Sequence, residues 1–566
     1  MGKRIKKYRW QLLIIALIIV IQFAFAFQKE GYHMDELISF EMANAEYNPW
    51  IVPKQPVGRL AKYMQEEIEA DSFGEKLSNI AETVTDVLKN RGNSKMLSYK
   101  ADVYDEPIWI TREQFQNYLT TDGTDNFNYL SVYFNVKDDN HPPVHFMLLH
   151  TVSSIFKGEI HPIMGCIINI LLSVGCAIVI MKCGLLLDQH NITKEGNGAK
   201  MGMLAAVFYG CSQASIATML LIRMYGLLTF LCLLTFYIHM KKWFGNSFDK
   251  KNIGLIFVTA LGFWTQYFFL FYCISLSLMI CIGLLKEKRK KELFVYIRTM
   301  IIAAIIGVVC FPFAISDVFS SSRGVEALNN LRGGISAYAE RLENFGSILL
   351  NRCFGDAVTG ILFLMIALGT AVWMFIKYKE HRMVLVIYYV PVIMYFLLAA
   401  KMSPMYVDRY LMASFPFVIS WLVPVFFVKP VRKKAAGIFM AGCLVLYLCI
   451  LVFTYDGEYL YKGYEQQVIK SEEYADKACI CLYEGYGFYD NLMEFTNYEK
   501  TLLVTPNELL ERKDVDSIYE LQDVVLVVKS EVSEQALNEV LEKYDFEIEE
   551  VLIDEGAHLD SVYLCN

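Results

Sequence analysis

Two adjacent carboxylates, Asp35 and Glu36, directly follow the first long apolar stretch of the chain, within the sequence HMDELISFE. Carboxylates beside a hydrocarbon region are costly unless they cap a helix, form an ion pair or take part in chemistry. Asp35 fits the N-cap of a helix over residues 36–44, which is the plain structural interpretation. A cap occupies one carboxylate oxygen, so Asp35 could also act as a general base.

A second polar sequence, DDNHPPVH, occupies residues 138–145. Pro143 suits the first turn of a helix, and Pro142 holds His141 in an extended conformation. Asp139, His141 and His145 could form a metal site, although the two prolines disturb the one-face spacing that helical ligands need. A rigid helix start, a metal cluster and a binding role for His141 are therefore all open from the sequence.

Three further segments place polar and aromatic residues at the ends of apolar stretches. They are LLIRMYG with Arg223 and Tyr225, WTQYFF with Tyr267, and KMSPMYVDRY with Lys401, Arg409 and Tyr410. Single arginines often reach towards lipid headgroups, and aromatic residues often form interfacial belts. However, all five segments fall on one side of the membrane in the topology derived next, and this convergence favours a shared functional site.

The composition indicates a polytopic membrane protein. Of the 566 residues, 55% are hydrophobic and 20% are charged, which is too apolar for a disordered chain or for soluble domains. Residues 456–566 carry 8 Lys and Arg against 27 Asp and Glu. Such an acidic segment excludes nucleic acid as its natural partner.

Eleven apolar stretches have about the length that a membrane-spanning helix needs. They cover residues 10–27, 163–187, 201–219, 221–240, 253–266, 267–285, 297–316, 358–376, 383–400, 410–428 and 435–454. The first follows a basic segment and lacks a small-x-small cleavage site after it. We therefore expect a retained span with its N-terminus in the cytoplasm, rather than a cleaved signal peptide.

Loop charges support this arrangement, because basic loops remain in the cytoplasm. With eleven spans, the four basic loops 241–252, 286–292, 377–382 and 429–434 are cytoplasmic. The stretch Val144–Phe156 is too short to span and is expected to lie at the outer surface.

The external segments are then 28–142, 317–356 and the C-terminal region. A helical pattern covers about 58–90, and the chain from 456 alternates strand-like and helix-like runs, which is typical of a small α/β domain. We therefore predict a membrane module over 1–455, with 28–142 and 317–356 as its first and second external loops, followed by a soluble domain over 456–566.

The order of these motifs resembles that of the GT-C glycosyltransferases. The shared features are DE after the first span, HPP before an interfacial helix, R-M-Y opening a span, an aromatic T-x-Y-F tip, and R-Y near the last spans. Family 39, with the protein O-mannosyltransferases and lipid A aminoarabinose transferases, is the nearest pattern, particularly its uncharacterised Gram-positive members. The resemblance covers about residues 10–430. Family members often have Thr-His-Tyr at the aromatic tip, where this chain has Gln266 between Thr265 and Tyr267.

This resemblance implies a GT-C fold in a bacterial plasma membrane and an inverting transfer of one sugar. The donor would be a polyprenyl-phosphate sugar, and the acceptor a hydroxyl of an envelope glycan, lipid or protein at the outer face. Asp35 would be the base and Glu36 would orient the acceptor or brace the external loop. The residues expected to bind the donor phosphate or substrate are His141, Arg223, Tyr225, Tyr267, Lys401, Arg409 and Tyr410.

No resident cofactor is expected from this resemblance. Two alternatives stay open from the sequence. One is a metal-dependent transferase in which Asp35 and a second acidic residue hold a divalent ion. The other is a non-enzymatic binder or transporter of lipid-linked glycans.

Overall fold

The structure is a computed structural model, and it forms two compact units. It describes residues 2–566 except 71, 91–92, 124, 194–195, 428–441, 444, 448–449, 451, 456 and 522. The membrane unit comprises Met1–Lys29, Asp138–His145 and Gly165–Leu460. The sheet unit comprises Glu30–Lys137, Phe146–Met164 and Tyr461–Asn566. Residues 30–137 of the first external loop and the C-terminal residues 461–566 thus fall within one compact unit.

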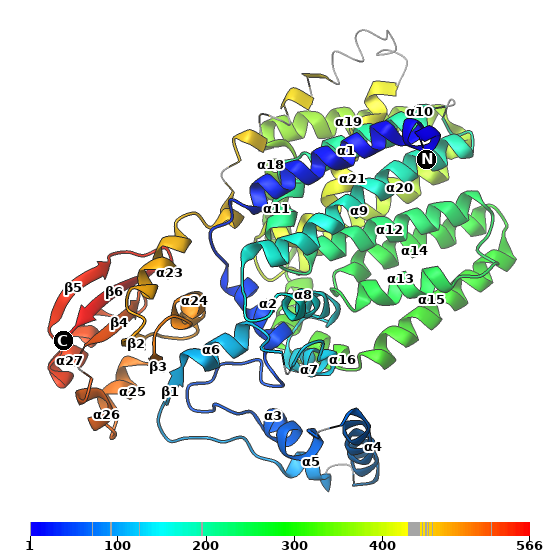
Figure 1. Cartoon of the computed structure of the whole chain (residues 1–566). Coiled ribbons are helices and arrows are strands. Elements are labelled where there is room, and N and C mark those ends of the chain that lie inside the picture. The colour runs from blue at the N-terminus through cyan, green and yellow to red at the C-terminus, as the bar shows by residue number, and fades with distance from the viewer. Residues whose placement is uncertain are drawn as a thin grey trace. The chain divides into compact units, whose positions relative to one another are not determined.

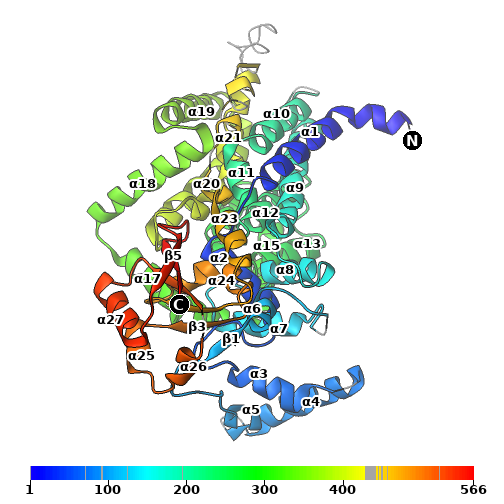
Figure 2. The ribbon, with the colours of Figure 1, turned by 60° about the vertical axis from the view of Figure 1, so that its left-hand side comes forward.

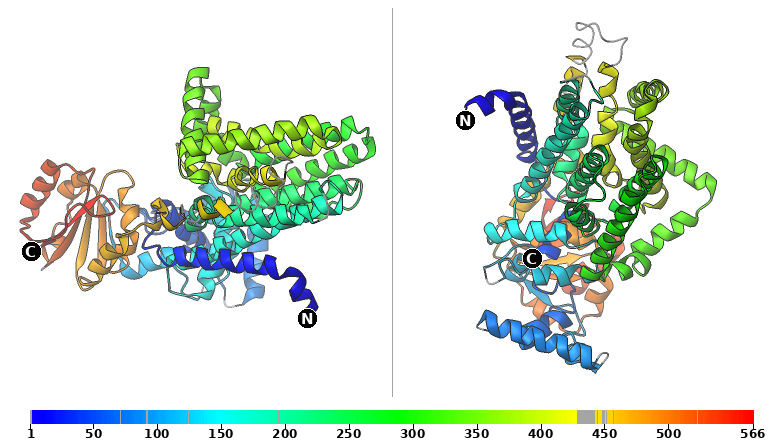
Figure 3. Two further views of the ribbon diagram at one scale, coloured as in Figure 1. Left: turned by 90° about the horizontal axis from the view of Figure 1, so that it is seen from above. Right: turned by 90° about the vertical axis from the view of Figure 1, so that its right-hand side faces the viewer.

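The membrane unit is a bundle of apolar helices (Figures 1 and 3). Among the described residues, 8 segments are long and apolar enough to cross a membrane, or up to 9 if a bent helix pair counts as one span. They are α1 (Gly2–Ala26), α9 (Pro162–Gln189), α12 (Tyr225–Phe244), α14 (Phe269–Lys286), α15 (Lys290–Cys310), α19 (Ala357–Lys377), α20 (Arg382–Met402) and the segment 408–427 with η5 (Asp408–Ser414), α21 (Phe415–Ser420) and η6 (Val423–Phe427). A multi-pass helical membrane protein is confirmed.

Three of the eleven predicted spans differ from the prediction or fall outside the described residues. The 201–219 stretch is two helices, α10 (Asn197–Gly210) and α11 (Gln213–Leu220), bent by 58° where Ser212 caps α11. The 253–266 stretch is α13 (Ile253–Phe263), whose 11 residues are too few to span alone. The 435–454 prediction lies largely outside the described residues. The excluded stretch forms α8 (Val144–Ile155), a helix of 12 residues, as expected.

The predicted second external loop is largely helical. It contains the second half of α16 (Ala314–Phe319) and all of α17 (Ser322–Arg332) and α18 (Ile335–Phe354). In the sheet unit, the first external loop forms α2 (Met34–Asn44), α3 (Arg59–Tyr63), α4 (Phe73–Asn90), α5 (Lys95–Ser98), α6 (Arg112–Leu119) and α7 (Tyr129–Asn135). The single helical pattern predicted over 58–90 is therefore interrupted, by a π-helix at Met64–Ile68 and by the residues before α4.

The sheet unit is built on one six-stranded sheet with the order β1-β3-β2-β4-β6-β5. Its strands are β1 (Trp109–Thr111), β2 (Ala478–Leu482), β3 (Lys500–Val504), β4 (Val524–Lys529), β5 (Ile548–Ile553) and β6 (Asp560–Cys565). Strand β2 pairs in parallel with both β3 and β4, and the other pairings are antiparallel. The small C-terminal α/β fold is confirmed. Strand β1, which comes from the first external loop, was not predicted.

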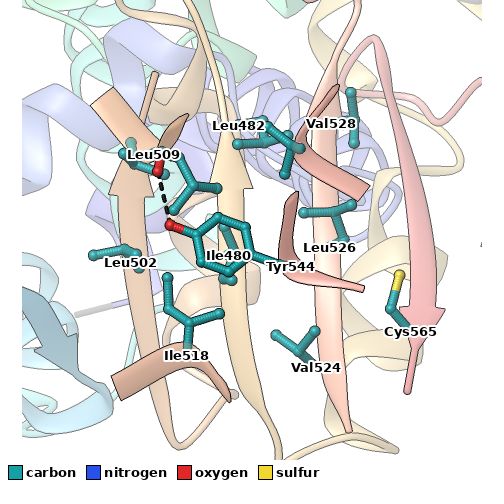
Figure 4. Packing of buried hydrophobic residues seen from close by; sticks show 12 residues of the cluster. Ile480, Leu482, Leu502, Leu509, Ile518, Val524, Leu526, Val528, Tyr544 and Cys565 are labelled. Carbon is teal, nitrogen blue, oxygen red and sulfur yellow. Dashed lines mark hydrogen bonds between the residues drawn. The ribbon is translucent and has the colours of Figure 1, made fainter. Parts of the chain in front are cut away.

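Helices cover both faces of this sheet. Helices α25 (Pro506–Glu511), α26 (Asp516–Tyr519) and α27 (Glu534–Tyr544) pack on one face through Leu509, Ile518 and Tyr544. Figures 2 and 4 show this layer, in which the Tyr544 hydroxyl donates a hydrogen bond to the Leu509 carbonyl oxygen at 2.7 Å. Helices α23 (Tyr464–Glu472) and α24 (Leu492–Phe495) lie on the other face (Figure 2). The continuous apolar strands β2, β3 and β4 are buried on both sides as a result.

Candidate active site

The acidic helix α2 belongs to the sheet unit, and His33 is its N-cap. The Nδ1 atom of His33 accepts a hydrogen bond from the backbone N–H of Asp35 at 3.0 Å. The Glu36 carboxylate accepts one from the backbone N–H of His33 at 2.9 Å, which completes a capping box. The expectation that Asp35 caps the helix is therefore wrong. The N-cap is two residues earlier, at His33. There the His33 ring and the Glu36 carboxylate accept hydrogen bonds from backbone N–H groups that have no partner within the helix.

The Asp35 side chain lies in the first turn of α2 beside the His33 ring. One carboxylate oxygen of Asp35 is 3.7 Å from His33 Nδ1, and the Asp35 side chain is 21% exposed. Glu36 is fully buried by contrast. The first carboxylate is thus reachable from solvent next to an imidazole, whereas the second holds the helix start.

A third carboxylate on the same helix, Glu41, was present in the motif but received no role from the sequence. It is fully buried, and neither of its carboxylate oxygens has a hydrogen-bond partner among the described protein atoms. Burial raises the pKa of Glu41 well above its usual value. A buried carboxyl without a partner is held neutral.

Glu41→Gln is expected to reduce the pH dependence of stability. Folded Glu41 keeps its proton after the unfolded carboxyl has released its own, so wild-type stability falls as pH rises above about 4.3. The slope is at most about 1.4 kcal/mol per pH unit, and it ends at the raised pKa of Glu41. Thermal unfolding between pH 4 and 8 measures it. The Gln variant should gain stability relative to wild type as pH increases, and Glu75→Gln, at an exposed position, is the control. Parallel curves for wild type and Glu41→Gln would contradict the neutral carboxyl.

In the membrane unit, a tight turn between α11 and α12 presents Arg223. The guanidinium-bearing side chain is only 4% exposed. Asn169 on α9 fixes the turn, because its side-chain amide donates to the carbonyl oxygens of Met219 at 3.1 Å and Leu221 at 2.7 Å. Helix α9 also approaches closely at Gly165, where a Cβ would lie 2.1 Å from the Ile222 side chain. The Arg223 turn is therefore held against α9 by the Asn169 hydrogen bonds and by the close packing of Ile222 on Gly165.

Gly165→Ala is expected to destabilise the membrane unit by about 1–3 kcal/mol, because the added methyl overlaps Ile222. Gly369→Ala on α19 is the matched control, since a Cβ there meets no atom within 4 Å. Alanine at Gly369 should be neutral or stabilising by up to about 1 kcal/mol. Thermal unfolding of both variants in the same detergent compares them, and equal midpoints would contradict the close approach of α9 to the turn.

Charged and polar side chains gather near Arg223 within the membrane unit. The His141 Nδ1 atom lies 3.0 Å from a carboxylate oxygen of Asp139. Burial opposes ionisation of Asp139, but the His141 ring and the Arg223 charge outweigh it and lower the pKa of Asp139. Burial, with the Arg223 charge and His141, lowers the pKa of His145 to about 3. At neutral pH the group therefore contains an ionised Asp139, a neutral His145 and the Arg223 cation.

The aromatic tip contributes a hydroxyl to the same surroundings. The Tyr267 hydroxyl donates to a carboxylate oxygen of the buried Asp317 at 2.5 Å. Burial first, and then Asp317 and the more distant Asp139 charge, raise the pKa of Tyr267. Gln266, at the position that departs from the family pattern, is buried, and its side-chain oxygen accepts from the backbone N–H of Phe268 at 3.4 Å. In this structure Gln266 therefore braces the tip itself.

The tyrosines of the R-M-Y and R-Y motifs meet in one aromatic cluster. The ring centroids of Tyr225 and Tyr410 are 6.2 Å apart, and those of Phe268 and Tyr410 are 5.1 Å apart. The Tyr395 hydroxyl donates to the Tyr410 carbonyl oxygen at 2.7 Å. Three motifs that are far apart in sequence thus converge through Tyr410.

Arg409 lies beside a buried ion pair that the sequence did not reveal. Its guanidinium is 5.7 Å from the centroid of the Tyr410 ring. The preceding residue, Asp408, pairs with Arg352 of α18 at 2.6 Å and accepts a hydrogen bond from the Tyr459 hydroxyl. Arg352 thereby anchors the start of η5 and fixes where the R-Y pair begins.

Lys401 contacts a different part of the membrane unit. Its ammonium donates to the Gly333 carbonyl oxygen at 2.8 Å and lies 4.9 Å from the centroid of the Tyr338 ring. The structure therefore brings Arg223 close to Asp139 and His145, and Asp139 close to His141 and Tyr267. It also brings Tyr225 together with Tyr410. Lys401 instead joins the end of α20 to the α17–α18 segment.

Within the described part of the chain, no cluster of three or more His, Cys, Asp or Glu side chains could hold a metal ion. Asp139 and His141 pair with each other, and His145 is kept neutral beside a cation. A chelator is the direct test of the metal alternative.

Comparison with known proteins gives matches among solved structures only. No protein-family model matches the chain, and no curated protein matches its sequence. ArnT from Cupriavidus metallidurans bound to undecaprenyl phosphate is 10% identical over 98% of both chains, with a TM-score of 0.47. The apo form of that protein is 9% identical over 75% of this chain and 87% of its own, with a TM-score of 0.45.

The Archaeoglobus fulgidus oligosaccharyltransferase tethered to an acceptor peptide is 11% identical over 95% of this chain and 68% of its own, with a TM-score of 0.39. At these identities and TM-scores, what this chain does has to be inferred from its own residues.

Proposed function

We propose that this protein is an inverting glycosyltransferase that moves one sugar from a polyprenyl-phosphate donor to a hydroxyl acceptor. The supporting observation is the convergence of the HPP, R-M-Y and T-x-Y-F motifs around Asp139. This carboxylate pairs with His141, lies within reach of the buried Arg223 cation, and acts on the Tyr267 hydroxyl. Tyr410 of the R-Y motif joins Tyr225 in the adjoining aromatic cluster. Interfacial anchors act independently, so residues this far apart in sequence would have no reason to lie next to one another if each were only an anchor.

The chemistry requires few protein groups. A lipid phosphate is a good leaving group, so the reaction needs a base for the acceptor hydroxyl and a cation for the phosphate, but no general acid. In this proposal Asp35 is the base, and Arg223 and Arg409 stabilise the departing phosphate as bidentate partners. His141, Tyr225, Tyr267 and Tyr410 shape the donor site. Lys401, whose ammonium donates to the Gly333 carbonyl oxygen, takes no part in phosphate binding in this proposal. Glu36 maintains the helix that presents Asp35.

The proposal also assigns sides of the membrane. The N-terminus is cytoplasmic, and the first external loop and residues 456–566 face outwards from a bacterial plasma membrane, where an envelope glycan, lipid or protein supplies the acceptor. An alkaline phosphatase fusion at residue 460 is expected to be active and one at residue 290 inactive, because basic loops remain in the cytoplasm. The reverse pattern would remove Asp35 from the side where the acceptor is expected.

The activity itself is testable with purified protein in nanodiscs. A panel of radiolabelled polyprenyl-phosphate sugars is offered with a mixture of hydroxyl acceptors, and transferred label is measured with and without EDTA. We expect transfer from one donor to survive the chelator. Loss of transfer with EDTA, restored by a divalent ion, would favour the metal-dependent alternative. Tight donor binding without transfer would favour a non-enzymatic binder.

A further inference from the structure

The membrane unit contains a second candidate binding site, far from the Arg223 turn. A cavity of about 520 Å³ lies among α9, α10, α12, α20 and the 408–427 segment. On α9, Asn169 contacts the Arg223 turn, whereas Leu187 lines the cavity. At 1.5 Å per helical residue these positions are about 27 Å apart, close to the thickness of a hydrocarbon core. The cavity is therefore at the opposite end of the bundle.

The interior of this cavity is mainly hydrocarbon. Its walls include Ile180, Leu187, Phe236, Met240, Leu385 and Phe417. Two polar side chains within it, Tyr388 and Ser420, hydrogen-bond to each other at 2.6 Å. Cavities of roughly 300–1,000 Å³ with apolar walls are typical of sites for small organic ligands. An apolar chain is the chemistry that these walls accept.

The residues next to the lining are basic. Lys241 and Lys242 follow the lining residue Met240 on α12. Lys377, Lys379 and Arg382 alternate with the lining residues Tyr378, Glu380 and His381. Lys241 and Lys379 are exposed, and the Arg382 Nε donates a hydrogen bond to the Phe375 carbonyl oxygen at 2.8 Å. Among the described residues, no Lys or Arg lines the cavity itself, but basic side chains beside a pocket between membrane helices are suited to an anionic lipid head group.

We infer that this cavity binds an anionic phospholipid, with one acyl chain between the helices and the phosphate at the basic mouth. The two requirements of such a ligand are met at one place, since the apolar walls and the basic segment 377–382 share the residues Tyr378, Glu380 and His381. In the predicted topology both basic loops face the cytoplasm, where the anionic phospholipids of the membrane surface attract positive side chains. The inference does not depend on the proposed transfer reaction.

The test is native mass spectrometry of the full chain released from nanodiscs containing equal amounts of phosphatidylglycerol and phosphatidylcholine. We expect one phosphatidylglycerol to survive delipidation of the wild type. Leu385→Trp, which fills the cavity, should lower its retention by at least about tenfold, because each buried methylene contributes to lipid binding. Val372→Trp on α19 is the matched control, since Val372 is 59% exposed and does not line the cavity.

A second pair of variants keeps the inference testable if Leu385→Trp fails to fold. Lys241→Gln combined with Lys379→Gln should abolish the preference for phosphatidylglycerol over phosphatidylcholine, whereas Lys290→Gln, at an exposed position on α15, should preserve it. Equal retention of the two phospholipids by wild type would overturn the inference, and so would unchanged retention in the filled variant. Displacement of phosphatidylglycerol by an equimolar polyprenyl phosphate would overturn the assignment to a phospholipid.

Discussion

Asp35→Asn is expected to give a folded protein whose sugar transfer is slower by roughly 10²–10⁴-fold, because the amide cannot accept the proton of the acceptor hydroxyl. Folding should survive because the helix cap depends on the His33 ring and the Glu36 carboxylate, and not on the Asp35 side chain. The measurement is turnover in nanodiscs at saturating donor, together with the thermal unfolding midpoint of the same preparation.

Glu36→Gln is the matched control for this experiment. Adjacent positions on a helix diverge by about 100°, so Asp35 and Glu36 cannot act as an equivalent pair on one sugar carbon. Glutamine at the third helical position still completes a capping box, so this variant should lose less activity than Asp35→Asn. Equal losses in the two variants would indicate a shared role such as metal binding. Full activity in Asp35→Asn would end the assignment of the base.

Much of the architecture was accessible from the sequence because its signals are local. Spanning helices appear as long apolar runs, and β2, β3 and β4 appear as short ones because they are buried on both faces of the sheet. Strand β1 has only three residues, and its partner β3 begins almost four hundred residues later. Neither its length nor its composition could indicate that pairing.

The start of α2 shows how a motif can be recognised and still be misassigned. Aspartate is among the preferred N-cap residues, so Asp35 was the natural choice. The Glu36 carboxylate, however, is three residues after His33, which is the spacing of a capping box. The spacing was visible in HMDE, but histidine is not among the residues usually expected at this position. The ring nitrogen supplies the acceptor that a Ser or Thr oxygen would otherwise provide.

The candidate site was predictable as a set of motifs but not as a set of contacts. Asn169 and Asp317 are single polar residues within or next to apolar helices, and Arg352 belongs to a segment interpreted as a loop. Each bonds to a motif that is distant in sequence. Asn169 bonds to the Arg223 turn, Asp317 to Tyr267, and Arg352 to Asp408. A polar residue in an apolar run is a usable signal, although it does not identify the partner.

Arg223→Ala is expected to reduce donor use by roughly 10²–10³-fold when the donor is limiting. A buried cation that stabilises developing phosphate charge acts in a low dielectric, where removing one such donor has an effect of this size. Arg223→Lys should lose less, because it keeps the charge but not the bidentate geometry. Arg298→Ala, which removes an exposed arginine on α15, is the control and should behave like wild type.

The pH profile separates a phosphate-binding role from a purely structural one. Arg223 helps to keep the pKa of Asp139 low and that of His145 at about 3, so its removal should raise both. Protonation of these groups would then occur nearer to neutral pH, and the residual activity of Arg223→Ala should fall off at a higher pH than that of wild type. Initial rates between pH 4 and 8 measure this. Wild-type rates in Arg223→Ala at limiting donor would contradict the assignment of Arg223 to the phosphate site. An unshifted pH profile would show that Arg223 does not affect the protonation of Asp139 and His145.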